Sequence, residues 1–276
     1  MDRREQLMNR VHSDYKMLED MGYTVLGVYV QGSDNYGLSY EGSDIDTKAI
    51  VLPSFDDFIA NKKPVSTTHI LSSLEHCDIK DLRVMFETIK KQNINFVEIL
   101  FTDYYYLNPL YEDLFMPMIE NRELIARFNK MASVKCMIGM ALEKRKALEH
   151  PYPTIKWKID KWGYDGKQLH HILRMRDFLE RYVNGESYKS CLTPRNREYL
   201  IDIKRNVENG EVITVERARE LSDNAVAEIR EIGNAYIDTL SDPIIDADAL
   251  QLFNTVLQSI LKQHFINEIL SGEGVI

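Results

Sequence analysis

The sequence predicts an α+β amino-terminal domain followed by an all-helical carboxy-terminal domain. Segments with strand and helix patterns alternate along the first part of the chain. Strand signals then fade from about Glu123, where long runs with helical periodicity begin. The chain has 276 residues, which is enough for two domains that each bury a core. We therefore expect a first domain over residues 1–130 and a second over residues 131–276.

Composition and charge limit what the protein binds. Apolar residues make up 44% of the chain and charged residues 28%, the ordinary range of a globular protein. The formal net charge is −9, so the chain as a whole has no general attraction to nucleic acid or to an anionic membrane. A substrate that bears phosphate must therefore meet a local group of cations or bound metal ions.

The cysteines and the amino terminus favour a soluble, cytoplasmic protein without membrane contact. Cys77, Cys136 and Cys191 are odd in number and widely spaced, which fits neither a disulfide framework nor a zinc site. The amino-terminal residues are charged throughout and contain no apolar signal region. No stretch of the chain is apolar over the length needed to span a bilayer.

The first domain is expected to begin with a helix and two strands. Apolar residues recur at near-helical spacing over residues 7–21, and Gly22 ends the run. Residues 23–33 and 45–53 are rich in β-branched and aromatic residues, which predicts buried strands.

Further elements of the first domain follow in order. Residues 54–60 predict a short helix capped by Ser54, and residues 65–79 predict a strand or a hairpin. Residues 80–93 predict a helix, and a short apolar element follows it. The second domain is then predicted from helical runs at residues 123–149, 166–185, 216–240 and 248–270.

Two aspartates stand at the start of the second predicted strand. Side chains alternate along a strand, so Asp44, Asp46 and Lys48 share one face if this segment is extended. The residues between them are mostly apolar and point the other way. Two carboxylates at this spacing repel each other unless a cation lies between them, and Mg²⁺ or Mn²⁺ prefers such oxygen ligands.

A glycine–serine pair, Gly32 and Ser33, ends the preceding strand. Glycine lets the backbone approach a ligand closely, and backbone N–H groups with a serine hydroxyl suit a phosphate. The two features together favour a metal beside a triphosphate, as in two-metal nucleotidyl transfer. The alternative is that Ser-Asp-Ile-Asp is only a capped turn on a solvated surface.

The segment "GSDNYGLSYEGSDIDTKAIVLP" resembles the signature of the DNA polymerase β-like nucleotidyltransferase superfamily. It is most similar to the bacterial and phage predicted nucleotidyltransferases, in which Gly-Ser-x-x-Tyr-Gly leads to Ser-Asp-x-Asp. The matching residues are Gly32, Ser33, Tyr36, Gly37, Ser43, Asp44 and Asp46, with Lys48 where the family tends to place a basic residue. Residues 78–101, 163–186 and 208–229 are similar to later family segments, so the resemblance covers nearly the whole chain.

The resemblance implies a catalytic domain with a mixed sheet flanked by helices, followed by a helical substrate-binding domain. It also implies a third metal-binding carboxylate on a later strand, for which Asp78 is the first candidate and Glu75 the second. The alternative for Asp78 is that it caps the following helix. We expect Glu98 to be structural and to pair with a buried backbone donor.

The helical domain carries a cationic stripe, defined as Lys167, His171 and Arg174. These residues recur at helical spacing, and the family motif that they resemble keeps them at the same intervals. The resemblance favours contact with the triphosphate or the acceptor; the alternative is a solvated basic face, with Asp177 and Arg181 paired along the helix. The preceding segment interleaves tryptophan, tyrosine and lysine, which suits either base stacking or a loop packed on the core.

The resemblance implies an enzyme that moves a nucleoside monophosphate from ATP or another NTP to a hydroxyl and releases pyrophosphate. Asp44 and Asp46 would hold Mg²⁺ or Mn²⁺ together with Asp78, and Ser33 would position phosphates. An RNA 3′ end or a tRNA is the acceptor that the resemblance suggests, as in RNA repair. One alternative is a non-catalytic nucleotide sensor or partner-binding module on the same fold. Another is an interaction protein whose helical half docks a partner.

Overall fold

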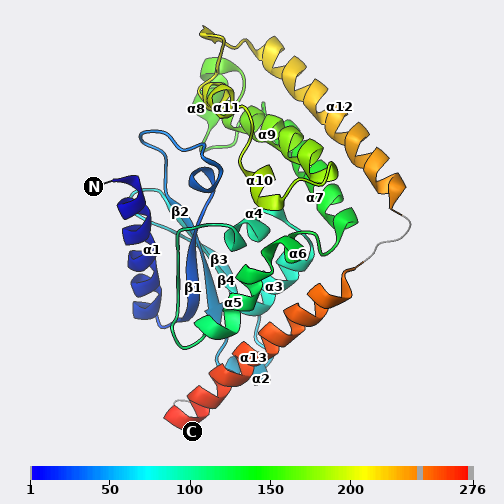
Figure 1. The fold of residues 1–276 in the computed structure, drawn as a ribbon. Helices are drawn as coiled ribbons and strands as arrows, with labels where there is room; N and C mark the ends of the chain where they lie inside the picture. The colour runs from blue at the N-terminus through cyan, green and yellow to red at the C-terminus, as the bar shows by residue number, and fades with distance from the viewer. Residues whose placement is uncertain (1, 241–244, 273–276) are drawn as a thin grey trace. The chain divides into compact units, whose positions relative to one another are not determined.

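The computed structural model describes residues 2–240 and 245–272. It confirms the predicted α+β class, with a five-stranded sheet flanked by helices and a separate helical region (Figure 1). The described chain forms two compact units. The first contains Met1–Asn35, Gly42–Asn129 and Ile245–Ile276, and the second contains Tyr36–Glu41 and Lys130–Ile244.

The sheet of the first unit is mixed, as the resemblance implied. Its strands in chain order are β1 (Thr24–Gln31), β2 (Asp46–Leu52), β3 (Ser66–Ile70), β4 (His76–Asp81) and β5 (Tyr105–Leu107). Their order in the sheet is β3-β4-β2-β1-β5. β2 and β4 pair in parallel, whereas β1 with β2, β1 with β5, and β3 with β4 pair antiparallel. The segment predicted as a strand or a hairpin is therefore the β3–β4 hairpin.

Helix α1 (Arg3–Asp20) covers one face of this sheet (Figure 1). Gly22 follows the helix with φ of +86°, a left-handed conformation that glycine adopts without strain. Apolar side chains of α1 pack on side chains from three strands: Leu7, Val11, Leu18, Val25, Val28, Val30, Ala49, Val51, Cys77 and Ile79. Since Ala49 and Val51 face α1, the alternation along β2 turns Asp46 and Lys48 to the opposite face of the sheet.

Short helices complete the first unit. They are α2 (Phe55–Ile59), α3 (Leu82–Lys90), α4 (Ile94–Val97), the 3-10 helix η2 (Glu98–Leu100), α5 (Glu112–Glu120) and α6 (Arg122–Ala126). Ser54 caps α2, because its hydroxyl accepts a hydrogen bond from the Asp57 N–H at 3.1 Å, as the sequence predicted. Asp81 caps α3, with a 2.8 Å hydrogen bond from the Arg83 N–H. Asp78 therefore lies inside β4 and does not cap that helix.

The last helix, α13 (Ala247–Ser271), belongs to the first unit. The Phe253 ring meets Phe86 of α3 and Phe128 at centroid distances of 5.8 and 5.3 Å. Buried His264 joins Tyr111 and the Pro53 carbonyl oxygen at 3.1 and 3.0 Å. The predicted domains, 1–130 and 131–276, differ from the observed division here and at residues 36–41. Helical periodicity shows that a segment has an apolar face, but it does not show which core that face joins.

The second unit is helical apart from a short two-stranded ribbon. Its elements are α7 (Lys130–Ala147), α8 (Lys156–Trp162), α9 (Gly166–Val183), α10 (Tyr188–Leu192), α11 (Arg197–Lys204), β6 (Val207–Glu208), β7 (Glu211–Val212) and α12 (Val215–Thr239). Helix α9 is central and packs on α7, α10, α11 and α12. The predicted run at 123–149 is two helices, because α6 ends at Ala126 and α7 begins at Lys130. Among the described residues, no helix has both the length and the apolar character needed to cross a bilayer.

Replacing Phe253 by alanine tests the position of α13. The ring is fully buried between Phe86 and Phe128, so Phe253→Ala is expected to lower the free energy of unfolding by about 3–5 kcal/mol. Urea unfolding measures this change. Leu250→Ala, on the same helix but 36% exposed, is the matched control and should cost less than about 1 kcal/mol. Equal, small effects of the two changes would contradict the packing of α13 in the first unit.

Candidate functional site

The turn after β1 is fixed by polar contacts on both sides. Gly32 has φ of +86°, and Ser33 begins the 3-10 helix η1 (Ser33–Tyr36). The Asn35 side-chain amide donates to the Val30 carbonyl oxygen at 2.8 Å. Asp34 forms an ion pair with Arg3 of α1 at 2.8 Å. The glycine–serine turn is therefore held against the first helix.

The acidic pair lies beside this turn. Gln31, the last residue of β1, is the cross-strand partner of Asp46, the first residue of β2. Gly32 and Ser33 thus leave the sheet at the edge where Asp44 and Asp46 enter it. Asp44 is exposed and precedes the strand, whereas the Asp46 side chain is 33% exposed.

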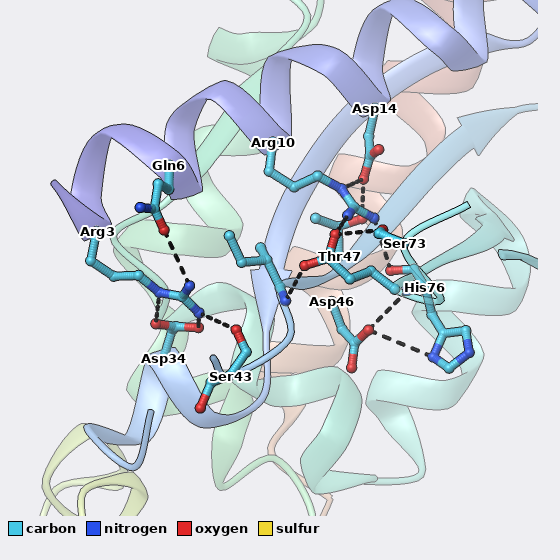
Figure 2. Close-up of polar contacts among 12 residues, drawn as sticks. Arg3, Gln6, Arg10, Asp14, Asp34, Ser43, Asp46, Thr47, Ser73 and His76 are labelled. Carbon is cyan, nitrogen blue, oxygen red and sulfur yellow. Dashed lines mark hydrogen bonds and ion pairs between the residues drawn. The ribbon is translucent and has the colours of Figure 1, made fainter. Parts of the chain in front are cut away.

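Two groups of His76 orient the Asp46 carboxylate. The His76 N–H donates to Asp46 Oδ1 at 2.9 Å, and the His76 ring nitrogen Nδ1 lies 3.6 Å from the same oxygen (Figure 2). His76 is the cross-strand neighbour of Asp46 in the parallel β2–β4 ladder, since Thr47 pairs with Cys77. One carboxylate oxygen is therefore committed to the backbone of β4.

A buried polar network lies under the same strand end. The Thr47 hydroxyl donates to Asp14 Oδ2, and Arg10 Nε donates to the same oxygen at 2.8 Å (Figure 2). Arg10 also forms an ion pair with Glu75 at 2.6 Å. Glu75 Oε1 in turn accepts the Ile45 N–H at 2.8 Å. Glu75, the second candidate for the third carboxylate, thus holds the segment that enters β2.

The sequence reasoning did not identify Arg10, Asp14 or Thr47. A signal was present, because Arg10 and Asp14 fall three or four residues from Leu7, Val11 and Leu18 on the face of α1 that packs on the sheet. Charged residues on an apolar helix face need partners inside the fold. Such a pattern predicts a buried ion pair, although the partner strand is not predictable from spacing.

Asp78 lies on the same sheet face as Lys48, its cross-strand partner. Its carboxylate forms ion pairs with Lys48 Nζ at 2.6 Å and with Lys80 Nζ at 2.8 Å. Burial raises the pKa of Asp78, but the two lysines outweigh burial and hold that pKa below its ordinary value. Burial lowers the pKa of Lys48, and Asp78 opposes that change. Lys48 is almost fully buried, with its ammonium 3.9 Å from the centre of the Phe96 ring.

These contacts decide how the carboxylates fit a divalent ion. Within residues 2–240 and 245–272, no group of three or more His, Cys, Asp and Glu side chains is arranged to hold a metal. Asp44 and Asp46 offer hard oxygen donors that are open to solvent, so this pair fits Mg²⁺ or Mn²⁺. Asp78 fits only if it leaves Lys48 and Lys80.

The Gly32 N–H faces a carboxylate. It donates to Glu98 Oε1 at 3.4 Å, and Glu98 is buried at the start of η2. Glu98 was expected to pair with a buried backbone donor; the donor is a backbone N–H, but Gly32 is half-buried. The Gly32 N–H is therefore engaged within the protein, which leaves Ser33 and the backbone beyond it for phosphate contact.

The stripe on α9 is less exposed than its spacing suggested. Lys167 is exposed, His171 is half-buried, and Arg174 is only 3% exposed. The Arg174 guanidinium lies 3.9 Å from the centre of the Tyr36 ring, so the signature tyrosine packs on the stripe within the helical unit. Arg181 and Asp177 form the expected i,i+4 pair at 3.5 Å. Arg174 is therefore buried against an aromatic ring, and the contact of the stripe with a triphosphate or an acceptor stays a prediction.

Burial also keeps the two histidines of α9 neutral. Burial, together with the nearby cations of Arg174, Lys204 and Lys167, lowers the pKa of His170 to about 4. The His170 Nδ1–H donates to the Leu200 carbonyl oxygen, which opposes the shift. Burial likewise lowers the pKa of His171 well below its ordinary value, with contributions from His170 and Arg174. His171 is therefore uncharged at neutral pH.

Gly37 and Tyr40 of the signature segment also pack within the helical unit. Arg205 and Lys204 place their cations 4.5 and 4.9 Å from the centre of the Tyr40 ring. Arg197 lies against Gly37, where an added Cβ would approach Arg197 Nη1 to 2.8 Å. These cations of α11 and its end lay outside the motifs that the sequence reasoning used.

A polar cavity of about 260 Å³ lies in the helical unit between α9, α11 and α12. Its lining includes Arg176, Arg217 and Glu228, and Arg176 pairs with Glu228 at 3.3 Å. None of the residues predicted for metal or nucleotide binding lines this cavity.

Comparison with known proteins finds a structural neighbour but no matching family model. No protein-family model matches the chain, and no curated protein matches it in sequence. Among solved structures, it is similar to the crystal structure of a nucleotidyltransferase-like protein from Exiguobacterium sibiricum 255-15. The two chains are 12% identical, the TM-score is 0.32, and the similarity covers 96% of this chain and 91% of the other. A TM-score of this size identifies neither a family nor an activity.

The neutral state of His170 makes stability depend on pH. The folded protein keeps His170 unprotonated down to a pKa of about 4, whereas the unfolded chain protonates it near its ordinary pKa of 6.5. Between these pH values the unfolded state binds more protons, so the free energy of unfolding falls as the pH is lowered. From pH 8 to pH 5 the loss due to His170 is about 2 kcal/mol.

Urea unfolding of the wild type and of His170→Asn at both pH values measures this contribution. Asparagine keeps a donor near the Nδ1 position for the Leu200 carbonyl oxygen. The variant should therefore lose about 2 kcal/mol less than the wild type on acidification. Identical losses in the two proteins would show that His170 is not held neutral.

Proposed function

We propose that the protein is a metal-dependent nucleotidyltransferase, which moves a nucleoside monophosphate from an NTP to a hydroxyl acceptor and releases pyrophosphate. The observation that carries this proposal is the pairing of Gln31 with Asp46. This pairing sets the glycine–serine turn beside the two solvent-accessible aspartates at one edge of the sheet. The sequence signature of the DNA polymerase β-like superfamily supports the same assignment. Mg²⁺ or Mn²⁺ held by Asp44 and Asp46 would supply charge neutralisation and a lowered pKa of the attacking hydroxyl.

The side chains of this edge have separate tasks in the proposal. Asp46 is oriented by the His76 N–H, which fixes one oxygen and leaves the other to a ligand. Ser33 offers its hydroxyl to a phosphate of the NTP. Asp46 is held by the backbone of β4, and Ser33 lies in the turn held by Asn35 and Asp34, so both groups would position the reacting phosphate with little reorganisation during the reaction.

For the third carboxylate we favour Asp78 over Glu75. Asp78 shares a face of the sheet with Asp46, because β2 and β4 run in parallel and Lys48 pairs with Asp78. Glu75 is held by Arg10 and by the Ile45 N–H. Lys48 and Lys80 neutralise the Asp78 carboxylate. A divalent ion that binds Asp78 would displace both ammonium groups, so metal binding would be coupled to the release of the two lysines.

One observation favours a second candidate function. Of the three carboxylates predicted to hold the metal, Asp78 is engaged in ion pairs, whereas Asp44 and Asp46 are open to solvent. A site with only these two ligands suits a protein that binds a nucleotide and a metal without turnover. Nucleotide sensing on the same fold is therefore the alternative.

Labelling with NTPs tests the proposal. The purified chain, Mg²⁺ or Mn²⁺, and each of the four NTPs labelled at the α-phosphate are incubated with RNA, DNA and protein acceptors. We expect transfer of label together with release of pyrophosphate. Asp44→Asn and Asp46→Asn should each lower the rate by at least about 10³-fold, since each change removes a ligand charge from the reacting centre.

Asp20→Asn is the matched control. Asp20 is exposed at the end of α1, and α1 is about 27 Å long, so Asp20 is remote from Arg3 and the turn that Arg3 holds. Its rate should equal that of the wild type. Labelling that persists in both Asp44→Asn and Asp46→Asn would overturn the proposal. A metal-dependent rise in melting temperature with an NTP, but without transfer to any acceptor, would support the sensor.

A further inference from the structure

Helix α8 carries an exposed and a half-buried tryptophan. The chain has two tryptophans, Trp157 and Trp162, and both lie on this seven-residue helix. Trp157 is 57% exposed, and the centres of the two indole rings are 5.6 Å apart. The Trp157 ring is therefore accessible to a ligand on the surface of the helical unit.

Lysines surround these rings. Lys161 Nζ lies 4.3 Å from the centre of the Trp162 ring, and Lys158 Nζ lies 5.9 Å from that of Trp157. Lys158 also pairs with buried Asp165 at 3.1 Å, and Lys156 pairs with Asp160 at 2.6 Å. Aromatic faces with cations beside them are the pattern that stacks bases while neutralising phosphates.

A second aromatic group lies at the same end of the helical unit. Asp165, the partner of Lys158, caps α9 through a 3.1 Å hydrogen bond from the Lys167 N–H. The next residue, Gly166, abuts the end of α11, because an added Cβ would lie 2.5 Å from Asn206 Oδ1. Lys204 and Arg205, which immediately precede Asn206, hold their cations over Tyr40. α8 and α11 thus meet through the amino-terminal end of α9 (Figure 1).

The charge balance of the chain agrees with an anionic ligand in this unit. The segments of the helical unit, residues 36–41 and 130–244, contain 20 lysines and arginines and 19 aspartates and glutamates. The rest of the chain contains 14 and 24. The negative net charge therefore belongs to the first unit, so it does not argue against phosphate binding on the helical unit.

We propose that this end of the helical unit binds single-stranded nucleic acid. We name the surface the aromatic–basic end and define it as Tyr40, helix α8 and the pair Lys204–Arg205. Its aromatic rings take unstacked bases, and Lys161 and Arg205 take the intervening phosphates. Paired bases are not available to such rings, which excludes a duplex as the preferred ligand. That the bound single strand is also the acceptor rests on the proposed function. That the surface binds a single strand does not depend on it.

Tryptophan fluorescence measures binding directly, since both tryptophans lie in the surface. The full-length chain, without NTP or metal, is titrated with a 12-nucleotide RNA of mixed sequence, with the DNA of the same sequence, and with the annealed duplex. We expect a saturable fall in emission with a single strand and a much weaker effect with the duplex. The affinity should fall as salt is added, because phosphate contacts release counterions.

Variants are compared by the anisotropy of a dye-labelled strand. Trp157→Ala should weaken binding about 10-fold or more through lost stacking. Lys161→Ala and Arg205→Ala should each weaken it and lower the slope of log affinity against log salt by about 0.7. Lys189→Ala is the matched control. Lys189 is exposed on α10, which packs near Arg181 at the far end of α9, about 20 Å or more away.

The outcomes separate this proposal from the proposed function. Binding that is lost in Trp157→Ala but kept in Lys189→Ala supports the aromatic–basic end, even if no transfer is found. Unchanged emission with every single strand, or equal affinities of Trp157→Ala and the wild type, would overturn it. In that case transfer to a protein or a small hydroxyl compound would still leave the proposed function in place. Circular dichroism confirms that each variant is folded.

Discussion

The start of β2 is fixed by a buried polar network, and the rest of the candidate site depends on it. The Thr47 hydroxyl is bound to Asp14, Asp14 is bound to Arg10, and Arg10 reaches Glu75 on the loop before β4. A shift of one residue along β2 would place Thr47 on the other face and leave Asp14 and Arg10 buried without it, which is costly. The same register turns Asp46 and Lys48 away from α1. A network inside the core thus determines which carboxylate meets solvent.

Much of the first unit was predictable because its elements obey local rules. Alternation along β2 gave the faces of Asp46 and Lys48, Gly22 gave the end of α1, and Ser54 gave the cap of α2. These features depend on residues that are close in sequence. The position of Asp78 was open in the sequence, which also allowed it to cap the following helix. The pairing of β2 with β4 places Asp78 inside a parallel strand, and Asp81 is the cap.

The features that the sequence did not predict are contacts between distant segments. α13 has an ordinary apolar stripe, and nothing in that stripe points to Phe86 and Phe128. Arg174 has the spacing of a surface cation, yet the Tyr36 ring covers it. Packing thus changes the charge that the stripe presents to solvent. Arg174 is covered by an aromatic ring, and burial lowers the pKa of His171 so that its ring is neutral. Such outcomes depend on which side chains a fold brings together, and spacing carries no information about that.

The signature segment belongs to two structural units. Its glycine–serine turn and its two aspartates lie in the first unit, while Tyr36–Glu41 packs with α9 and α11 in the second. A single short motif therefore ties the carboxylate edge to the helical unit through the chain itself.

The most direct test of the account is a crystal structure with Mn²⁺ and a non-hydrolysable NTP, with the metal located by its anomalous scattering. The account predicts a manganese peak within about 2.3 Å of a carboxylate oxygen from both Asp44 and Asp46, beside the triphosphate. A nucleotide bound with its metal away from both aspartates would contradict it.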